Sequence, residues 1–480
     1  MTVAPQPVSE LVLPSSDDPV VAAAVTAVGG PPGRHARLSG RRLWTPVRVL
    51  IALTLLTCTL GLLEKSPCLD PASWVHQHQY TRGCYTDLLP LYSNEGLADG
   101  QRPYLDHKVE YPVLIGGLMQ VAADAVKPFA PASRSTRFVE ITIALMTACA
   151  VVTAICLTRV SGRRPWDAAL FALSPGLLLA GFINWDLAAA AFLGLGLLAW
   201  ARRHPVWAGV ALGLGGATKL YPLVLLAPLA LLCIRAGRWK ELGLTLLGSA
   251  SAWLVVNLPI ALAAPAGWRY FYTFSQQRGA DWGSVFYVLQ YFRGPLDTNL
   301  APNQSPHLLN LAASLAFLAG LAGVAVLTFT ARRRPRLAQV MFLTLAAFCL
   351  SNKVYSPQYV IWLLPLAALA RPRWGAFLAW QASEVIAFFA IWYYLVTVSV
   401  AGQGIGASWY FAALLTRDVV LLGLCALVVR DVLHPEHDVV RRDGADDPAG
   451  GVLDGAEDRI LIARRPAPAV SSRPPRPVRV

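Results

Sequence analysis

A group of acidic residues follows the first long apolar stretch of the chain. Asp87, Glu95, Asp99, Asp106 and Glu110 all lie in the segment CYTDLLPLYSNEGLADGQRPYLDHKVEYPVL. A carboxylate at a membrane boundary can act as a general base toward an acceptor hydroxyl. Loop acids are ordinarily solvated, which is the expectation for Asp99 and Asp106. Asp87 differs, because apolar and aromatic residues flank it and partial burial would raise its pKa toward that of a useful base.

Two further charged residues stand at the ends of apolar helical stretches. Lys219 ends the Gly-rich segment GVALGLGGATK, where its cation could hold a phosphate or could simply extend to the interface. Asp186 follows an apolar stretch in the sequence Asn-Trp-Asp. Because burial of a carboxylate in a membrane is costly, Asp186 is a candidate functional residue, although a position at the interface weakens that inference.

Two later loops supply the remaining candidates for substrate binding. Arg278 lies in WRYFYTFSQQRGADWGSVFYVLQYF, where it could contact a phosphate or form a surface pair with Asp281. The segment SNKVYSPQYVIWLLP contains Lys353, Gln358 and Tyr359. These three are candidates for contacts with a substrate, because the predicted topology places them on the same side of the membrane as Asp87.

The sequence favours neither a metal ion nor an organic cofactor. The loops expected to face outward contain no HxxxH, CxxC or DxD pattern, and the chain has no glycine fingerprint of a dinucleotide-binding domain. Neutralisation of a phosphate would therefore depend on Lys and Arg. Cys68 and Cys84 are the two cysteines of a polar loop, and we predict a disulfide between them, worth about 3 kcal/mol in the chain-entropy model.

Composition identifies the class of protein that must position these residues. The 480 residues are 55% hydrophobic and 14% charged, which is too apolar for a water-soluble globular protein. The net charge is +13, but Lys and Arg form short clusters between apolar runs rather than a stripe with aromatic residues. Nucleic acid is therefore a poor partner, and the basic clusters are better interpreted as topology signals.

The apolar runs predict a polytopic all-α membrane protein. A spanning helix needs roughly 17 to 25 mostly apolar residues. We expect about twelve spans, near residues 47–63, 138–157, 166–182, 187–201, 206–218, 221–234, 242–264, 308–330, 338–350, 359–370, 375–396 and 408–429. This order places every arginine cluster on the same side as both termini, which we predict to be cytoplasmic. Residues 112–131 are instead expected to form an interfacial amphipathic helix.

These spans divide the chain into three parts. Residues 1–46 form an N-terminal tail and residues 431–480 a charged, proline-rich C-terminal tail, and both are predicted to be disordered and cytoplasmic. Residues 47–430 form the transmembrane domain. Within it, residues 64–137 and 265–307 are the two long loops that face outward, and the first is where chemistry is expected.

The motifs of the first outward loop resemble a known enzyme family. The loop contains Asp-Leu-x-x-Leu-Tyr, then Gly-x-x-Pro-Tyr, then Glu-Tyr-Pro, carried by Asp87, Leu88, Leu91, Tyr92, Gly100, Pro103, Tyr104, Glu110, Tyr111 and Pro112. This pattern is similar to the GT-C glycosyltransferases, in particular family 87 of polyprenyl-phosphate-mannose-dependent mannosyltransferases. Many members of that family have a histidine after a later Ser-Pro pair, where this chain has Gln358 and Tyr359.

The resemblance implies a GT-C-like helical bundle and an inverting hexosyltransferase of the plasma membrane. Asp87 would be the catalytic base, Glu110 and Tyr111 would shape the loop, and the site would face the extracytoplasmic side. The donor would be mannose on a polyprenyl phosphate, and the acceptor a membrane lipid or glycan such as a phosphatidylinositol mannoside. The open alternatives are a transporter or lipid-carrier flippase, a GT-C enzyme that uses arabinose or glucose, and a noncatalytic assembly partner.

Overall fold

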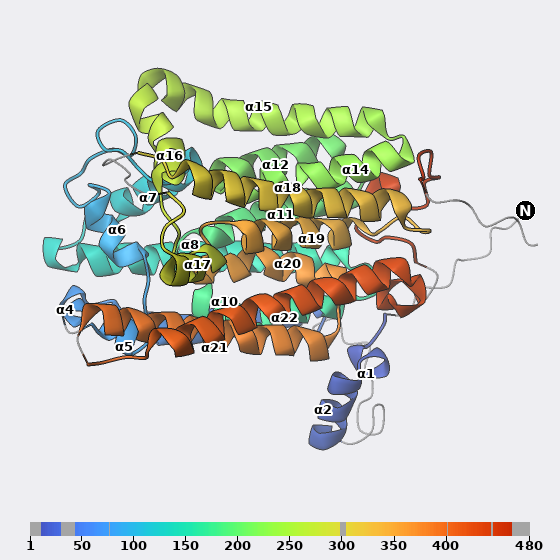
Figure 1. Ribbon diagram of the computed structural model, residues 1–480, viewed down its shortest axis with the longest axis horizontal. Coiled ribbons are helices and arrows are strands. Elements are labelled where there is room, and N and C mark those ends of the chain that lie inside the picture. Colours follow the sequence, from blue (N-terminus) through green and yellow to red (C-terminus); the bar gives the residue numbers. More distant parts are fainter. Residues whose placement is uncertain are drawn as a thin grey trace, which may run out of the picture.

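The protein is a bundle of α-helices that run along one long axis (Figure 1). The computed structural model describes residues 11–29, 44–75, 77–297, 304–400, 402–442 and 445–462. In these residues the only β-type pairing is an isolated bridge between Pro103 and His107. The predicted all-α class is therefore confirmed.

Six helices of the described chain are long and apolar enough to cross a membrane. They are α3 (Pro46–Lys65), α8 (Arg134–Val160), α15 (Trp239–Ala263), α18 (His307–Thr330), α21 (Trp374–Ser399) and α22 (Ala407–Leu433). A 20-residue helix is about 30 Å long, which matches the hydrocarbon core of a bilayer. Large apolar side chains point outward from α15, α18 and α22, and a lipid environment explains their exposure. The protein is thus a multi-pass membrane protein.

Shorter apolar helices fill the interior between the long ones (Figure 1). They are α11 (Asp186–Ala201), α12 (Pro205–Thr218), α14 (Leu226–Ala236), α19 (Leu337–Ser351) and α20 (Val360–Ala370). Every residue of α20 is buried. All five coincide with predicted spans, but because several are shorter than a bilayer is thick, the count of about twelve crossings stays a prediction.

One predicted span, residues 166–182, is a broken element rather than a single helix. It consists of η3 (Pro165–Ala168), α9 (Ala169–Ala172) and α10 (Pro175–Ala180). The break falls at Ser174, since a residue before proline disfavours the α conformation. Neighbouring helices satisfy the freed backbone: Thr57 donates to the carbonyl of Ala172 at 2.6 Å, and the Gln381 Oε1 accepts from Gly176 N at 2.9 Å. Such a break is tolerated at membrane depth only when protein surrounds it.

The two long loops predicted to face outward lie together at one end of the bundle, called the loop end below (Figure 1). The first forms η1 (Ser66–Cys68), α4 (Pro71–Trp74), α5 (His78–Thr81), α6 (Leu88–Asn94), α7 (Val113–Val126) and η2 (Pro131–Ser133), and the second forms α16 (Pro265–Gln277) and α17 (Val285–Arg293). Cys68 and Cys84 are joined by a disulfide. The helix expected over residues 112–131 is α7; residues 298–303 lie outside the described residues.

The opposite end, called the arginine end, corrects the prediction of disordered tails. Residues 431–442 and 445–462 are folded against the bundle and include η5 (Pro435–His437), η6 (Val439–Arg441) and η7 (Gly451–Leu453). Arg336 pairs with Asp438 at 2.7 Å, and Arg235 pairs with Asp458 at 2.6 Å. The composition argument failed because acids of the tail compensate arginines that the bundle buries.

The N-terminal tail also has described structure at the arginine end. It forms α1 (Pro14–Asp17) and α2 (Pro19–Gly29), and Asp17 pairs with Arg164 at 2.7 Å. The prediction of disorder is wrong for these residues as well. The parts of the tails at residues 1–10, 30–43 and 463–480 lie outside the described residues.

We expect Asp438→Asn to destabilise the protein strongly. Arg336 and Asp438 are both about 2% exposed or less, so the substitution would leave a buried guanidinium without its counter-charge, a change that costs about 3–5 kcal/mol. Thermal unfolding of the purified protein in detergent would measure the effect as a lower Tm. The matched control is Glu436→Gln, because that carboxylate is exposed. Equal Tm values for Asp438→Asn and wild type would contradict a stabilising role of the tail.

Candidate active site at the loop end

Asp87 stands immediately before α6 and is held by contacts from distant parts of the chain. Its backbone N–H donates to the carbonyl of Ile183 at 2.8 Å. The first turn of α6 buries Leu88 and Leu89, and the helix packs on α8. The apolar residues that flank Asp87 are therefore buried, and they fix Asp87 at the edge of the bundle.

The carboxylate of Asp87 is polarised and partly desolvated. Oδ1 accepts a hydrogen bond from the Tyr85 hydroxyl at 2.7 Å, and Oδ2 accepts from Asn184 Nδ2 at 3.4 Å. Burial raises the pKa of Asp87 to about 6, although the Tyr85 hydrogen bond and the charge of Lys219 oppose this shift. The residue retains partial exposure, so a ligand can reach it. A carboxyl with this pKa can take a proton near neutral pH.

Lys219 brings a cation next to these acids. It follows the end of α12 in an extended conformation, and its Nζ lies 3.4 Å from Asp186 Oδ1 and 4.6 Å from the centroid of the Tyr111 ring. Helix α12 can approach α15 closely because its glycines face that helix: a Cβ at Gly209 or Gly213 would collide with the α15 backbone. Small residues at a helix interface allow such close packing in membrane proteins.

Asp186 is buried beneath Lys219 rather than exposed at the site. The side chain is 2% exposed, and its Oδ1 accepts a hydrogen bond from Trp362 Nε1 at 2.7 Å. The adjacent Tyr359 stacks on the Trp362 ring at 3.6 Å, and Gln358 beside it is buried. The sequence therefore named residues that are close together here, but Asp186 lies too deep to touch a ligand directly.

Glu110 and Tyr111 line the same region. Burial raises the pKa of Glu110, while the charges of Arg278 and Lys219 lower it. Tyr111 is buried and packs edge-on against Trp185 at 5.6 Å. The Tyr104 hydroxyl donates to the carbonyl of Pro112 at 2.7 Å, which ties the Gly-x-x-Pro-Tyr motif to the Glu-Tyr-Pro motif. Both motifs thus shape one loop.

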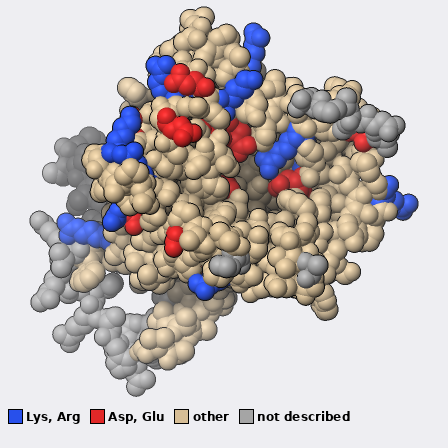
Figure 2. All heavy atoms as spheres, turned by 90° about the vertical axis from the view of Figure 1, so that its left-hand side faces the viewer, with Lys and Arg blue, Asp and Glu red and all other residues tan. Residues whose placement is uncertain are grey.

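The second loop of the loop end contributes Arg278. Its guanidinium lies 3.3 Å from Asp281, so the predicted surface pair exists, and the side chain is 41% exposed. It also lies close enough to Glu110 for each charge to affect the pKa of the other. Figure 2 looks onto the loop end and shows acidic and basic side chains around a hollow.

Lys353 does not offer a free cation to a ligand. Its Nζ donates to the carbonyls of Gln276 at 3.0 Å and Arg278 at 2.6 Å, and to Asn310 Oδ1 at 2.5 Å. An ammonium group has three donors, so all are occupied. Burial lowers the pKa of Lys353 to about 8. In this structure Lys353 holds the Arg278 loop in place.

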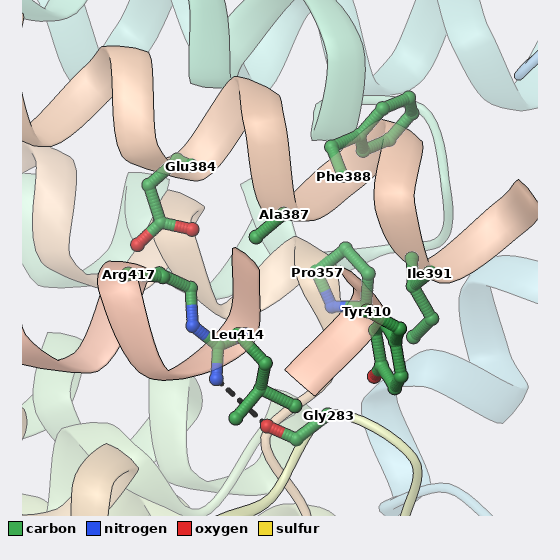
Figure 3. Close-up of a pocket in the computed structure, with 9 residues that line it drawn as sticks. All are labelled: Gly283, Pro357, Glu384, Ala387, Phe388, Ile391, Tyr410, Leu414 and Arg417. Carbon is green, nitrogen blue, oxygen red and sulfur yellow. Dashed lines mark hydrogen bonds between the residues drawn. The ribbon is translucent and has the colours of Figure 1, made fainter. Parts of the chain in front are cut away.

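The sequence reasoning missed a second anchor of the same loop, Arg417 on α22. This buried guanidinium donates to the carbonyl of Gly283 at 2.7 Å, pairs with Asp418 at 3.0 Å and lies 3.7 Å from the centroid of the Tyr355 ring. Figure 3 shows Arg417 and Glu384 together at a small cavity between α21, α22 and the loops at Gly283 and Pro357. Charged residues inside an otherwise apolar span were the available signal.

Glu95 is another residue whose environment the sequence did not reveal. It is 5% exposed, and burial together with the charge of Glu110 raises its pKa to about 7. His107 Nε2 lies 3.9 Å from it. Glu95 and Glu110 thus lie close enough in the first loop for the charge of one to act on the other. Among the described residues, no group of three His, Cys, Asp or Glu side chains is arranged to hold a metal ion.

Comparison with known proteins places these features in a family context. The sequence model of glycosyltransferase family 87 matches residues 122–351, just under half of the chain. The match confirms the resemblance to family 87 that the motifs indicate. It includes Asp186, Lys219 and Arg278, and excludes Asp87, Glu110 and Lys353. No curated protein matches the sequence.

Two solved structures are similar at low identity. ArnT from Cupriavidus metallidurans, bound to undecaprenyl phosphate, has 15% identity and a TM-score of 0.41, with 82% of this chain and 78% of that chain covered. The oligosaccharyltransferase of Archaeoglobus fulgidus in its apo form has 14% identity and a TM-score of 0.38, with 82% of this chain and 56% of that chain covered.

We expect Arg417→Lys to loosen the Arg278 loop. Lysine keeps the charge but cannot reproduce the forked contacts to Gly283 and Asp418. Loss of a hydrogen bond from a charged group costs about 1.5–3 kcal/mol, so amides of residues 278–284 should exchange with solvent on the order of tenfold faster or more. Hydrogen–deuterium exchange measured by mass spectrometry tests this. Arg430→Lys on the same helix is the control, and unchanged exchange in Arg417→Lys would contradict the anchoring role.

Proposed function

We propose that the protein is a glycosyltransferase that moves mannose from a polyprenyl-phosphate donor to a hydroxyl of a membrane lipid or glycan, with inversion. The observation that carries this proposal is the carboxylate of Asp87, which Tyr85 and Asn184 orient and which lies close enough to Lys219 for that cation to lower its pKa. The match to glycosyltransferase family 87 supports the reaction class.

Asp87 is the proposed general base. It accepts the proton of the acceptor hydroxyl while that oxygen attacks the anomeric carbon of the donor sugar, and the phosphate of the carrier lipid leaves with the electron pair of the broken bond. Tyr85 and Asn184 orient the carboxylate through its two oxygens. General base catalysis of this kind contributes typically 10²–10⁴-fold.

Lys219 and Arg278 are the proposed ligands of the donor phosphate. Both lie close enough to Glu110 to act on it electrostatically, and charge-assisted hydrogen bonds suit a phosphate. Lys353 has a positioning role in this proposal, because its donors are occupied. Gln358 and Tyr359 remain candidates for contacts with the sugar or the acceptor.

We further propose that the loop end faces the extracytoplasmic side of the plasma membrane. The paired arginines Arg164, Arg235 and Arg336 lie at the opposite end, as the excess of basic residues in cytoplasmic loops leads one to expect. The Cys68–Cys84 disulfide in the loop end suits an oxidising compartment.

One feature favours an enzyme over the alternative of a transporter. Asp87 and Glu110 lie in a loop at one end of the bundle rather than at its mid-depth, where transporters bind their substrates. Arabinose or glucose on the same carrier would use the same base and the same phosphate ligands, so it is the resemblance to the mannosyltransferases of family 87 that favours mannose.

Transfer of radiolabelled mannose from polyprenyl-phosphate-mannose to membrane lipids tests the proposal. Asp87→Asn should lower the rate on the order of 10²-fold or more, because the amide cannot accept the proton. The control is Asp99→Asn, an exposed acid of the same loop. The wild-type rate should rise with pH and reach half of its plateau near the Asp87 pKa of about 6, since the base works only when ionised.

The possible outcomes separate the parts of the proposal. Equal rates in Asp87→Asn and wild type would exclude Asp87 as the base. Transfer from an arabinose or glucose donor but not from the mannose donor would change the sugar and keep the mechanism. Movement of lipid-linked sugar across vesicle membranes without transfer would favour the flippase alternative.

A further inference from the structure

Asp186 and Lys219 form an ion pair in which the carboxylate of Asp186 is buried, whereas the ammonium group of Lys219 is partly accessible. Asp186 is 2% exposed and Lys219 14% exposed, with 3.4 Å between Oδ1 and Nζ. A ligand in the hollow can therefore contact Lys219, but it can interact with Asp186 only electrostatically, without touching it. The burial of a carboxylate costs free energy in a membrane protein, and carboxylates that are buried there usually have a function.

The charge of Asp186 is only partly compensated. Oδ1 accepts from Trp362, whereas Oδ2 has no hydrogen-bond partner within the described residues. The nearby Tyr221 hydroxyl and Trp185 Nε1 also lack partners there. Lys219 is thus the main counter-charge of Asp186, and any anion that binds Lys219 must share it with this carboxylate.

Lys219 and Arg278 share their charges with several acids. Asp186 pairs with Lys219 and Asp281 with Arg278, and both cations act electrostatically on Glu110. Lys219 also acts on Asp87. Such an environment tolerates one negative charge on a ligand better than two, since each added charge meets the same fixed carboxylates.

The proposed reaction increases the negative charge of the phosphate. The donor carries a phosphodiester with one negative charge. When the bond from the anomeric carbon to the phosphate oxygen breaks and the acceptor oxygen bonds to that carbon, the phosphate keeps the electron pair and becomes a monoester. The acceptor proton passes to Asp87. The product lipid phosphate therefore carries up to one more negative charge than the donor.

We propose that Asp186 is a positioning residue that promotes release of the product lipid phosphate by sharing the cation of Lys219 with it. This inference rests on the proposed function, in which Lys219 holds the phosphate. A substitution that disrupted the site would weaken the binding of the product. The inference predicts the opposite: removal of the Asp186 charge should tighten that binding.

The test compares the binding of polyprenyl monophosphate to purified full-length variants. In Asp186→Asn the Trp362 hydrogen bond can persist, and the Kd of the monophosphate should fall on the order of tenfold, with a lower kcat and a smaller decrease in the KM of the donor. Lys219→Met should raise the Kd instead. The matched control is Asp124→Asn on α7, whose side chain is 50% exposed and which should bind like wild type.

The outcomes distinguish this inference from the proposed function. Weakened binding in Lys219→Met together with unchanged or weakened binding in Asp186→Asn would overturn the role of Asp186 and leave the phosphate ligand intact. Unchanged binding in Lys219→Met would instead remove Lys219 from the proposed donor site, and the inference with it.

A second measurement uses the wild-type protein alone, so it does not depend on whether a variant folds. At pH 8, wild-type protein should bind the dianionic polyprenyl monophosphate no more tightly than its monoanionic methyl diester. Tighter binding of the monoester by tenfold or more would contradict the inference, because it would mean that the site rewards the second charge.

Discussion

The ion pair between Asp186 and Lys219 is the constraint on which the loop end depends. It requires α12 to end at Thr218, with the next residue extended, and it requires α20 to bring Trp362 against Asp186. The glycines of α12 allow close packing on α15, which places the end of α12 at the site. A single continuous helix through residues 206–234 could not present Lys219 in this way.

The two loops of the loop end build the candidate site around this charge. The disulfide, the Tyr104 hydrogen bond and the packing of α6 fix the first loop, and Lys353 and Arg417 fix the second. The result is a carboxylate that is buried enough for its pKa to rise yet open enough for a ligand to reach. The long outer helices provide the membrane surface, and the short inner helices leave room for the loops above them.

Much of this arrangement could be predicted from the sequence. Hydrophobic runs predicted eleven of the twelve apolar segments that form helices or helix pairs, and the motifs of residues 87–112 indicated the resemblance to glycosyltransferase family 87 that the family model supports. The role of Asp87 as the base stays a proposal. Tertiary contacts decided the rest. The segment 166–182 breaks at Ser174, which precedes Pro175, and Thr57 and Gln381 satisfy the backbone groups that the break frees. Nothing local to the segment signals the presence of these two partners.

The misses share a physical cause, which is that the partners of charged side chains lie far away in the sequence. Asp438 and Asp458 order a tail whose composition resembles disorder, because Arg336 and Arg235 are buried at the places where the tail passes. The sequence indicates Lys353 as a candidate ligand, whereas in the structure three acceptors occupy its donors. Arg417 lies in an apolar span, and its contact with the carbonyl of Gly283 has no signal in the local sequence. In each case the partner determines the role.

A structure of the protein with polyprenyl phosphate, determined by cryo-electron microscopy, is the most direct test of the central claim that the loop end is a lipid-phosphate glycosyltransferase site. We expect the phosphate to lie within ion-pair distance of Lys219, with the position of the leaving sugar directed toward Asp87. A phosphate bound elsewhere, or a lipid that reaches the arginine end instead, would contradict it.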